Sequence, residues 1–326
     1  MKTALVTGAN GFLGSVLVRR LRREGISVRA LCRDPHKGDH LAALGAEVIR
    51  GDIQLPATLE TPMRGCDVVF HAAAVHSSAA TSYNVNVIGT QNVVTAARTA
   101  KVGRLVHVSS VAVYGYHIAG DVTEETPMRP SPNDYYTQSK ALGEQVLWHE
   151  ARRGGLPTVS IRPAFIYGEG SAFWSRGLYR LVATRRAPMV NQGRGNAHPI
   201  FVEDVVDLLI TSATHPNAPG NAFNAAPDPA PTWADYLGHY ARIAGKDTSK
   251  AYVNLPPAAA LLAALIGGIT RLRGVPTDAA GMLHYIGTRA TYRMTHAAER
   301  LGWRPRYSLV EGMAAQETWL RGLSLV

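Results

Sequence analysis

Short apolar runs alternate with longer amphipathic segments through the first two thirds of the chain. The apolar runs predict buried strands over residues 3–7, 27–32, 47–50, 67–71, 104–108, 158–162 and 222–224. Helices are predicted between them, the longest over residues 82–101 and 134–153. This alternation indicates an α/β fold with a doubly wound parallel sheet, and such sheets bind their ligands at the carboxyl ends of the strands.

The pattern changes after the sixth predicted strand. Four or more helices are predicted from residue 232 onward, the last over residues 309–323. We therefore expect a sheet domain over residues 1–165, with 200–226 returning to it, and a smaller, mostly helical domain over 166–199 and 227–326. The longest apolar stretch, residues 255–269, is too short to span a bilayer. We expect it to cover an apolar pocket, and contact with a membrane surface stays open as the alternative.

The chain of 326 residues carries a formal charge of +10 and 46% apolar residues. Its lysines and arginines are scattered instead of clustered with aromatic residues, which argues against nucleic-acid binding and for small anionic ligands. Cys32 and Cys66 alone give no disulfide framework, and the first apolar run is broken too early for a signal peptide, so we expect a cytoplasmic protein. Among the twelve histidines, His36 and His40 are four residues apart, but Gly38 lies between them and no third ligand is near, so we expect no metal site.

A glycine-rich turn, Gly8-Ala9-Asn10-Gly11-Phe12-Leu13-Gly14, joins the first predicted strand to a helix over residues 15–24. Glycines at this spacing permit a tight turn and a close approach of the backbone to a ligand. The helix N-terminus then faces the pyrophosphate of a dinucleotide. A tight loop without a ligand would need similar glycines. The strand and helix on either side favour dinucleotide binding over that alternative.

The end of the second predicted strand normally carries the residue that reads the adenosine ribose. A carboxylate there would bind the 2′-hydroxyl group of NAD. Here the position is Cys32, and Arg33 follows it. Because a guanidinium suits a 2′-phosphate, we predict NADP as the favoured cofactor, with NAD as the alternative. Asp34 opposes this preference, and Arg33 could equally be an ordinary surface arginine in a loop.

Further ligand-facing residues are expected after the third and fourth predicted strands. Asp52 and Ile53 follow the third strand, and Asp52 is placed to hold the adenine amino group, although an acid there is equally a helix cap. Ala72, Ala73 and Ala74 follow the fourth strand, and their small side chains let a ligand lie on the backbone.

Tyr136 and Lys140 are four residues apart, so they share one face of a helix. A fixed ammonium favours the phenolate, which would bring the pKa of the phenol toward the range of an acid–base catalyst. This spacing alone is more typical of a solvated helix face. Ser109 and Ser110, however, end the fifth predicted strand at the sheet edge where the loop to Tyr136 also arrives, so Tyr136 is the candidate acid or base.

Together these motifs resemble the extended short-chain dehydrogenases/reductases, the group that contains nucleotide-sugar epimerases, dihydroflavonol-type reductases and 3β-hydroxysteroid dehydrogenases. The matching positions are Thr7-Gly8-x-x-Gly11-x-x-Gly14, Gly51-Asp52-Ile53, His71-Ala72-Ala73-Ala74, Asn86-Val87-x-Gly89-Thr90, Ser109-Ser110-x-x-Val113-Tyr114-Gly115, Tyr136-x-x-x-Lys140, Arg162-Pro163 and Leu301-Gly302-Trp303-x-Pro305. They cover nearly the whole chain. The resemblance implies a Rossmann-type nicotinamide domain, a smaller substrate domain and a homodimer formed through residues 82–101 and 134–153.

The resemblance also implies roles for single residues. Tyr136 would be the general acid or base at a carbonyl or carbinol oxygen, Ser110 would hydrogen-bond that oxygen, and Lys140 would bind the nicotinamide ribose and lower the tyrosine pKa. Asn86 is expected beside the cofactor, where it stabilises the active-site helix. The nicotinamide is expected to lie against Pro163 and Ile166. Substrate contacts are expected from His76, Val111, Phe165, Trp174 and His198.

The reaction class follows from departures within the group. Val111 and Ala112 stand where 4,6-dehydratases carry an acidic pair, so dehydration is not expected. Residues 169–190 contain arginines but no Asn or Gln, unlike the diphosphate sites of sugar epimerases. We therefore predict an NAD(P)-dependent oxidoreductase that interconverts a carbonyl and an alcohol on a mainly apolar small molecule. A nucleotide-sugar epimerase with recycled NAD and a non-catalytic dinucleotide-binding regulator are the alternatives, and the intact Ser110, Tyr136 and Lys140 argue against the regulator.

Overall fold

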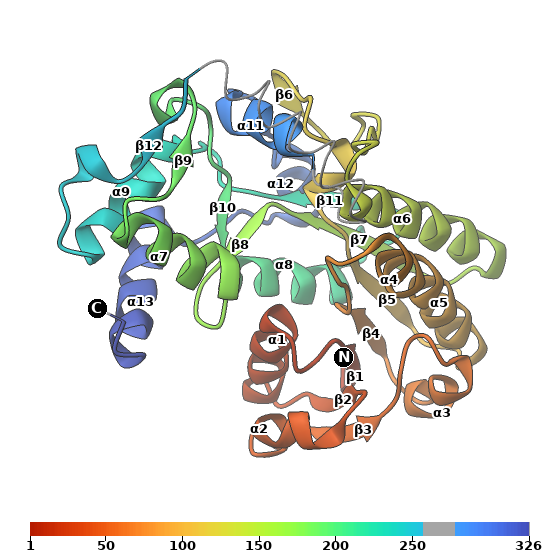
Figure 1. Cartoon of the computed structure of the whole chain (residues 1–326). Helices are drawn as coiled ribbons and strands as arrows, with labels where there is room; N and C mark the ends of the chain where they lie inside the picture. The colour runs from red at the N-terminus through yellow and green to blue at the C-terminus, as the bar shows by residue number, and fades with distance from the viewer. Residues whose placement is uncertain (257–277, 326) are drawn as a thin grey trace.

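The computed structural model describes residues 1–256 and 278–325, and a seven-stranded parallel sheet forms its centre (Figure 1). The strand order is β11-β7-β5-β4-β1-β2-β3. The strands are β1 Thr3–Thr7, β2 Ser27–Cys32, β3 Glu47–Arg50, β4 Val68–His71, β5 Arg104–Val108, β7 Thr158–Pro163 and β11 Ala222–Ala225. Every neighbouring pair is parallel, and the order reverses between β1 and β4. The predicted doubly wound α/β fold is therefore confirmed.

Helices cover both faces of this sheet (Figure 1). One face carries α1 Phe12–Arg23, α2 Asp39–Ala42 and α8 Val202–Thr214. The other carries α3 Glu60–Met63, α4 Ala79–Tyr83, α5 Gly89–Thr99 and α6 Tyr135–Gly154. The single helix predicted over residues 82–101 is in fact α4 and α5 joined by a π-helical turn, Asn84–Ile88. Such a turn adds one residue to the helical repeat and often occurs at functional sites.

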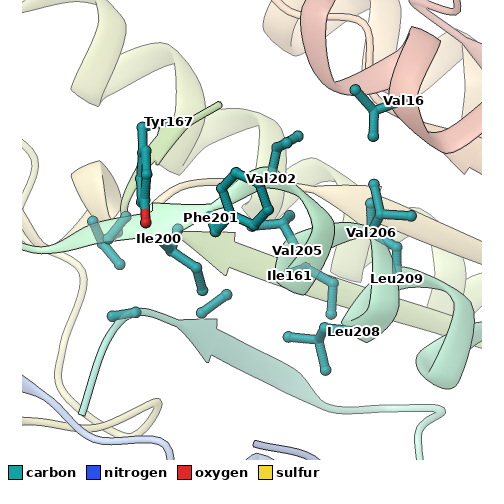
Figure 2. Packing of buried hydrophobic residues seen from close by; sticks show 14 of the residues in the cluster. Val16, Ile161, Tyr167, Ile200, Phe201, Val202, Val205, Val206, Leu208 and Leu209 are labelled. Carbon is teal, nitrogen blue, oxygen red and sulfur yellow. The ribbon is translucent and has the colours of Figure 1, made fainter. Parts of the chain in front are cut away.

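The core under α8 shows how the second half of the chain returns to the sheet. Val202, Val205, Val206 and Leu209 recur at helical spacing, so they form one apolar stripe. Figure 2 shows this stripe beside Ile161 of β7. Each fully buried valine or leucine contributes about 1.5–3 kcal/mol relative to exposure, so α8 is held mainly by the hydrophobic effect.

A smaller lobe lies beside the carboxyl ends of the strands (Figure 1). Its helices are α7 Leu178–Ala183, α9 Trp233–Ile243, α11 Ala279–Gly287, α12 Thr295–Leu301 and α13 Leu309–Gly322. It also includes or borders three parallel strand pairs, β8 Phe165–Tyr167 with β10 Pro199–Phe201, β9 Pro188–Met189 with β12 Val253–Asn254, and β6 Asp121–Val122 with β13 Thr291–Tyr292. The lobe is therefore helical with small strand pairs at its joints.

Short helical turns complete the connections. They are η1 Pro35–Gly38, η2 Pro56–Thr58, η4 Val111–Tyr114, η5 Ala172–Gly177, η6 Asn191–Gly193 and η7 Thr248–Lys250. Most of the apolar stretch 255–269 lies outside the described residues. Across residues 1–256 and 278–325, no helix is long and apolar enough to cross a membrane, and no group of three His, Cys, Asp or Glu side chains could hold a metal ion.

A buried ion pair fastens α6 to the sheet. The Arg162 guanidinium of β7 donates to both carboxylate oxygens of Glu144 on α6, at 2.7 to 3.2 Å. Its remaining nitrogen donates to the hydroxyl of Tyr114 at 2.7 Å, and that hydroxyl donates to Asn224 of β11 at 2.8 Å. Both charged side chains are almost fully excluded from water. The network therefore connects α6, the loop after β5 and two adjacent strands.

We predict that Glu144→Gln lowers the free energy of unfolding by about 3–5 kcal/mol, because it leaves the Arg162 charge buried without a counter-ion. The matched control is Glu317→Gln, which breaks the exposed pair with Arg321 and should cost less than about 1 kcal/mol. Urea unfolding followed by circular dichroism measures both. Equal losses in the two variants would contradict the role given to the buried pair.

Candidate active site

The turn between β1 and α1 brings three backbone segments into contact. Gly8 has a φ of +67°, and a Cβ atom there would lie 2.7 Å from the amide nitrogen of Ala73. A Cβ atom on Gly14 would lie 2.1 Å from the carbonyl oxygen of Gly8. Helix α1 begins at Phe12, three residues earlier than predicted, and its N-cap residue Gly11 offers no side chain to the first amides. These free amides and the bare backbone fit the pyrophosphate of a dinucleotide.

A buried histidine holds the loop opposite this turn. Thr7 Oγ1 lies 2.8 Å from Nδ1 of His71 and accepts a hydrogen bond from the Ala73 amide at 3.3 Å. His71 Nε2 lies 3.0 Å from the hydroxyl of Thr90 on α5. Burial lowers the pKa of His71 to about 3, so its ring is neutral at physiological pH. The ring fixes the loop of Ala72, Ala73 and Ala74 against the glycine turn, where the sequence places the cofactor.

Exposed arginines follow β2 and end β3, where the sequence predicts that the adenosine lies. Arg33 is exposed, and its side chain makes no hydrogen bond or ion pair with the described residues. Asp34 forms no ion pair with it, and one oxygen of the Asp34 carboxylate caps η1 by accepting from the His36 amide at 3.2 Å. Arg50, which pairs with Cys32 in the β2–β3 register, adds a second exposed cation that the sequence analysis missed. Only the register of two parallel strands brings Arg50 beside the end of β2.

Asp52 stabilises the turn that follows β3 and does not cap η2, whose N-cap residue is Leu55. One oxygen of its carboxylate accepts from the Gln54 amide at 2.9 Å. Its own amide donates to the hydroxyl of Thr58 at 3.0 Å. Ile53 is buried in the core beneath α5, where its side chain meets Gly89. These two residues therefore shape the loop after β3.

Tyr136 stands in the first turn of α6, and one carboxylate fixes that turn. Asp134 caps the helix by accepting from the Thr137 amide at 2.9 Å, and its other oxygen accepts from the Tyr116 hydroxyl at 2.8 Å. Burial and, to a lesser degree, the charge of Asp134 raise the pKa of Tyr136, while a hydrogen bond with Ser110 lowers it. Lys140 was expected to lower the pKa of Tyr136. The pKa is instead raised, because burial has the largest effect on it.

Lys140 is engaged at the end of β5. Its ammonium donates to the carbonyl oxygen of Val108 at 2.7 Å. Burial lowers the pKa of Lys140 to about 8, against a smaller raising effect of Glu144. The side chain is therefore mainly cationic at pH 7, and it lies beneath the first turn of α6. Its charge also lowers the pKa of buried His71, so cation and imidazole share one buried layer.

Ser110 begins η4, where its hydroxyl accepts from the Ala112 amide at 3.1 Å. Ser110 lines the cavity described below, whereas Ser109 is buried behind it. Asn86 acts at a distance from the cavity. Its amide group bonds the amide and the carbonyl of Val75 at 2.9 and 2.8 Å and the hydroxyl of Ser139 at 2.9 Å. Asn86 therefore joins the loop after β4 to α6.

A cavity of about 680 Å³ opens beside these groups. Ser110, Tyr136 and His76 line one end of it, and Val111 borders them. The rest of the wall is mainly aromatic and aliphatic. Among the described residues that line the cavity, none is Asp, Glu, Lys or Arg. A cavity of this kind favours an uncharged, mainly apolar ligand with one polar group at the Ser110 end.

Aromatic contacts stiffen the far wall. Phe165 stacks on Trp174 with ring centroids 4.1 Å apart, and its ring lies 5.4 Å from that of Trp233. The carbonyl oxygen of Trp174 accepts from the hydroxyl of Tyr240 at 2.8 Å, so α9 holds the stack in place. Phe165 and Trp174 were expected at the substrate, and both line the cavity. Trp233 was missed, because the sequence marks it only as the start of a helix.

His198 was expected to contact the substrate, but it is not part of the cavity lining. His198 is fully buried, and its ring nitrogens lie 3.1 Å from the Tyr285 hydroxyl and 3.0 Å from the Ala290 carbonyl. It supports Tyr285, which lines the cavity, and does not reach the cavity itself. Burial lowers the pKa of His198 to about 4. Pro163 and Ile166 flank the lining residues Ala164 and Phe165 without being part of the lining.

Comparison with known proteins places the chain in one family. The model of the NAD dependent epimerase/dehydratase family matches residues 4–226. The 4-hydroxy-2-methyl-3-oxo-4-farnesyl-3,4-dihydroquinoline-1-oxide ketoreductase of Stigmatella aurantiaca is 34% identical over 320 residues, which cover 95% of this chain and 94% of that protein. The 2-alkyl-3-oxoalkanoate reductase of Stenotrophomonas maltophilia is 29% identical over 324 residues, which cover 95% and 96%.

A solved structure extends the match over both lobes. MoeE5 in complex with UDP-glucose and NAD is similar with a TM-score of 0.78 and 25% identity, over 99% of each chain. The resemblance found from sequence motifs is confirmed by these matches. The chain belongs to the NAD-dependent epimerase/dehydratase family of enzymes, within the extended short-chain dehydrogenases/reductases.

Proposed function

We propose that this enzyme is an NAD(P)-dependent reductase that interconverts a carbonyl and an alcohol on a bulky, uncharged, mainly apolar molecule. The cavity carries the proposal, because Ser110 and Tyr136 lie together in its lining and its described walls contain no Asp, Glu, Lys or Arg. An apolar ligand gains about 25 cal/mol per Å² of surface that leaves water, so such walls select for hydrophobic bulk.

Each polar residue has one role in this proposal. The nicotinamide supplies the hydride when it is bound. Tyr136 donates a proton to the carbonyl oxygen, which Ser110 holds by a hydrogen bond. Because burial raises the pKa of Tyr136, the phenol keeps its proton at neutral pH until the oxygen gains charge. Lys140 binds the ribose, and it shares the helix face of Tyr136, one turn further along α6.

The cofactor in this proposal is NADP. The turn of Gly8 and Gly14 leaves room for the pyrophosphate, and the exposed Arg33 and Arg50 lie where the second and third strands end. Guanidinium groups form strong, often bidentate hydrogen bonds with phosphate. The Asp34 carboxylate caps η1 and forms no ion pair with Arg33. NAD stays the alternative cofactor.

In this proposal the two lobes bind different ligands. Residues 1–165 with 200–226 hold the cofactor, and the described parts of 166–199 and 227–326 close over the substrate. This division follows the cavity lining, because Trp174, Trp233 and Tyr285 all come from the second set. A substrate then lies between the two lobes, with its carbonyl group toward α6.

The relatives support a reductase. The protein of Stigmatella aurantiaca is named as a ketoreductase of a farnesylated bicyclic compound, and that name fits a large apolar cavity. The likeness to MoeE5 favours nucleotide-sugar epimerisation as the second candidate. A nucleotide sugar brings a diphosphate, however, and the described cavity lining has no Lys or Arg to receive it. The reductase is therefore the function that the site supports best.

We predict that Tyr136→Phe lowers turnover by about 10²- to 10⁴-fold, because the carbonyl oxygen loses its proton donor. The test measures NADPH oxidation over a panel of uncharged bicyclic and long-chain ketones, and uses the ketone that the wild-type enzyme reduces fastest. The matched control is Tyr135→Phe, next in the chain and outside the cavity lining, which should keep wild-type turnover. Wild-type turnover in Tyr136→Phe would refute the assignment of the proton donor.

We predict that Arg33→Ala weakens NADPH binding by about 10- to 100-fold, which corresponds to one lost charged hydrogen bond of about 1.5–3 kcal/mol. NADH binding should change little, because NADH has no 2′-phosphate. Fluorescence titration of the reduced cofactors measures both affinities, and Arg23→Ala, on the exposed end of α1, is the control. An equal loss for the two cofactors would rule out a 2′-phosphate contact.

A further inference from the structure

We infer that His76 is a further catalytic residue, which returns a proton from solvent to Tyr136 after Tyr136 has protonated the carbonyl oxygen. This inference rests on the proposed function, because it concerns how the proton donor is restored. The imidazole of His76 lies against the phenol of Tyr136, with ring centroids 5.0 Å apart and an angle of 40° between the rings. Both side chains line the cavity.

The loop that carries His76 is fixed on both sides. Val75 before it donates from its amide to the side-chain oxygen of Asn86 at 2.9 Å, and its carbonyl oxygen accepts from the Asn86 side-chain nitrogen at 2.8 Å. Ser77 after it donates from its amide to the hydroxyl of Ser82 at 3.2 Å, and Ser78 caps α4. The imidazole is exposed, although its backbone is anchored. His76 is therefore placed to meet solvent on one side and Tyr136 on the other.

The other histidines near the sheet edge cannot do this. His71, His107 and His198 are at most 2% exposed. Burial lowers the pKa of each imidazole, so all three stay neutral. Burial also keeps them out of contact with water. Lys140 is buried as well, and its ammonium donates to the Val108 carbonyl. Among these groups, only His76 combines exposure with contact to the phenol.

The groups around His76 leave its ring free for proton transfer. The start of α6 contributes Tyr136 and the Asp134 carboxylate, whose two oxygens accept from the Thr137 amide and the Tyr116 hydroxyl. The loop after β5 contributes the hydroxyl of Ser110. The described residues opposite, on α11 and β13, contribute the phenols of Tyr285 and Tyr292. No described carboxylate that lines the cavity competes for the imidazole.

The proposed step moves one proton and no electrons. When Tyr136 has given its proton to the substrate oxygen, it is a phenolate. The N–H bond of the His76 imidazolium breaks, and that proton forms the O–H bond of Tyr136. The neutral imidazole then takes a proton from water at the cavity mouth. In alcohol oxidation the same proton travels outward. Because burial makes the phenolate unfavourable, a fast proton return is needed between turnovers.

We predict that His76→Ala lowers kcat by at least about 10-fold while KM stays within about 2-fold, since the group acts in turnover and not in substrate binding. Added imidazole should restore much of the lost kcat in His76→Ala and none in Tyr136→Phe. The control is His117→Ala, an exposed histidine outside the cavity lining, which should behave as wild type. A raised KM with unchanged kcat, or a loss of kcat that imidazole does not restore, would overturn the inference.

A second readout needs no turnover. In the cofactor-free enzyme, Tyr136→Phe should shift the nuclear magnetic resonance signals and the titration midpoint of the His76 imidazole, and leave those of His117 in place. Unchanged His76 signals would also overturn the inference. The experiments distinguish a failure of this inference from a failure of the proposed function. If His76→Ala is as fast as wild type while Tyr136→Phe is inactive, only the inference fails. If the wild-type enzyme reduces no ketone, the proposed function fails.

Discussion

The ion pair of Arg162 and Glu144 determines where the chemistry can take place. It is buried between β7 and α6, so the helix that carries Tyr136 and Lys140 cannot slide along the sheet without separating two charges in a medium of low polarity. The same guanidinium binds the hydroxyl of Tyr114 in the turn that follows Ser110. One side chain therefore sets the distance between the strand end with the serine and the helix with the tyrosine and lysine.

Burial then sets the protonation states of this arrangement. It raises the pKa of Tyr136 and lowers that of Lys140 to about 8, so a neutral phenol and a cation stand near each other at pH 7. This pair suits a proton donor whose product is an anion. The cavity beyond them has aromatic walls, and its described lining contains no charge. Proton transfer at one end and hydrophobic selection at the other fit the reduction of a ketone on a large apolar molecule.

The parts of the site that depend on local sequence could be predicted, and the parts that depend on distant contacts could not. The helical repeat alone places Tyr136 above Lys140, and the glycine spacing alone identifies the turn after β1. His198, by contrast, was expected at the substrate, but its ring nitrogens are taken by residues 87 and 92 positions away. Arg50 reaches the end of β2 only through strand register.

The fold shows the same division. The strands follow from apolar runs, and each agrees with the structure to within one residue. The π-helical turn Asn84–Ile88 was missed, because the amphipathic pattern continues through it without a break. Its Asn86 bonds to the loop before α4 and to Ser139 on α6, and these tertiary bonds have no signature in the hydrophobic pattern. The direction of the pKa shift of Tyr136 could not be predicted either. It depends on the burial of the phenol, and residue spacing gives no information about burial.

The central claim is that the cavity reduces an uncharged apolar ketone with net consumption of its cofactor. The most direct measurement incubates the enzyme with NADPH deuterated at the transferable position, together with tetralone as a bicyclic apolar ketone or with UDP-glucose, and follows both by nuclear magnetic resonance. The account predicts deuterium on the carbinol carbon, with one alcohol formed for each NADPH oxidised, and unchanged UDP-glucose. Epimerised sugar without net cofactor oxidation, beside unreacted ketone, would contradict it.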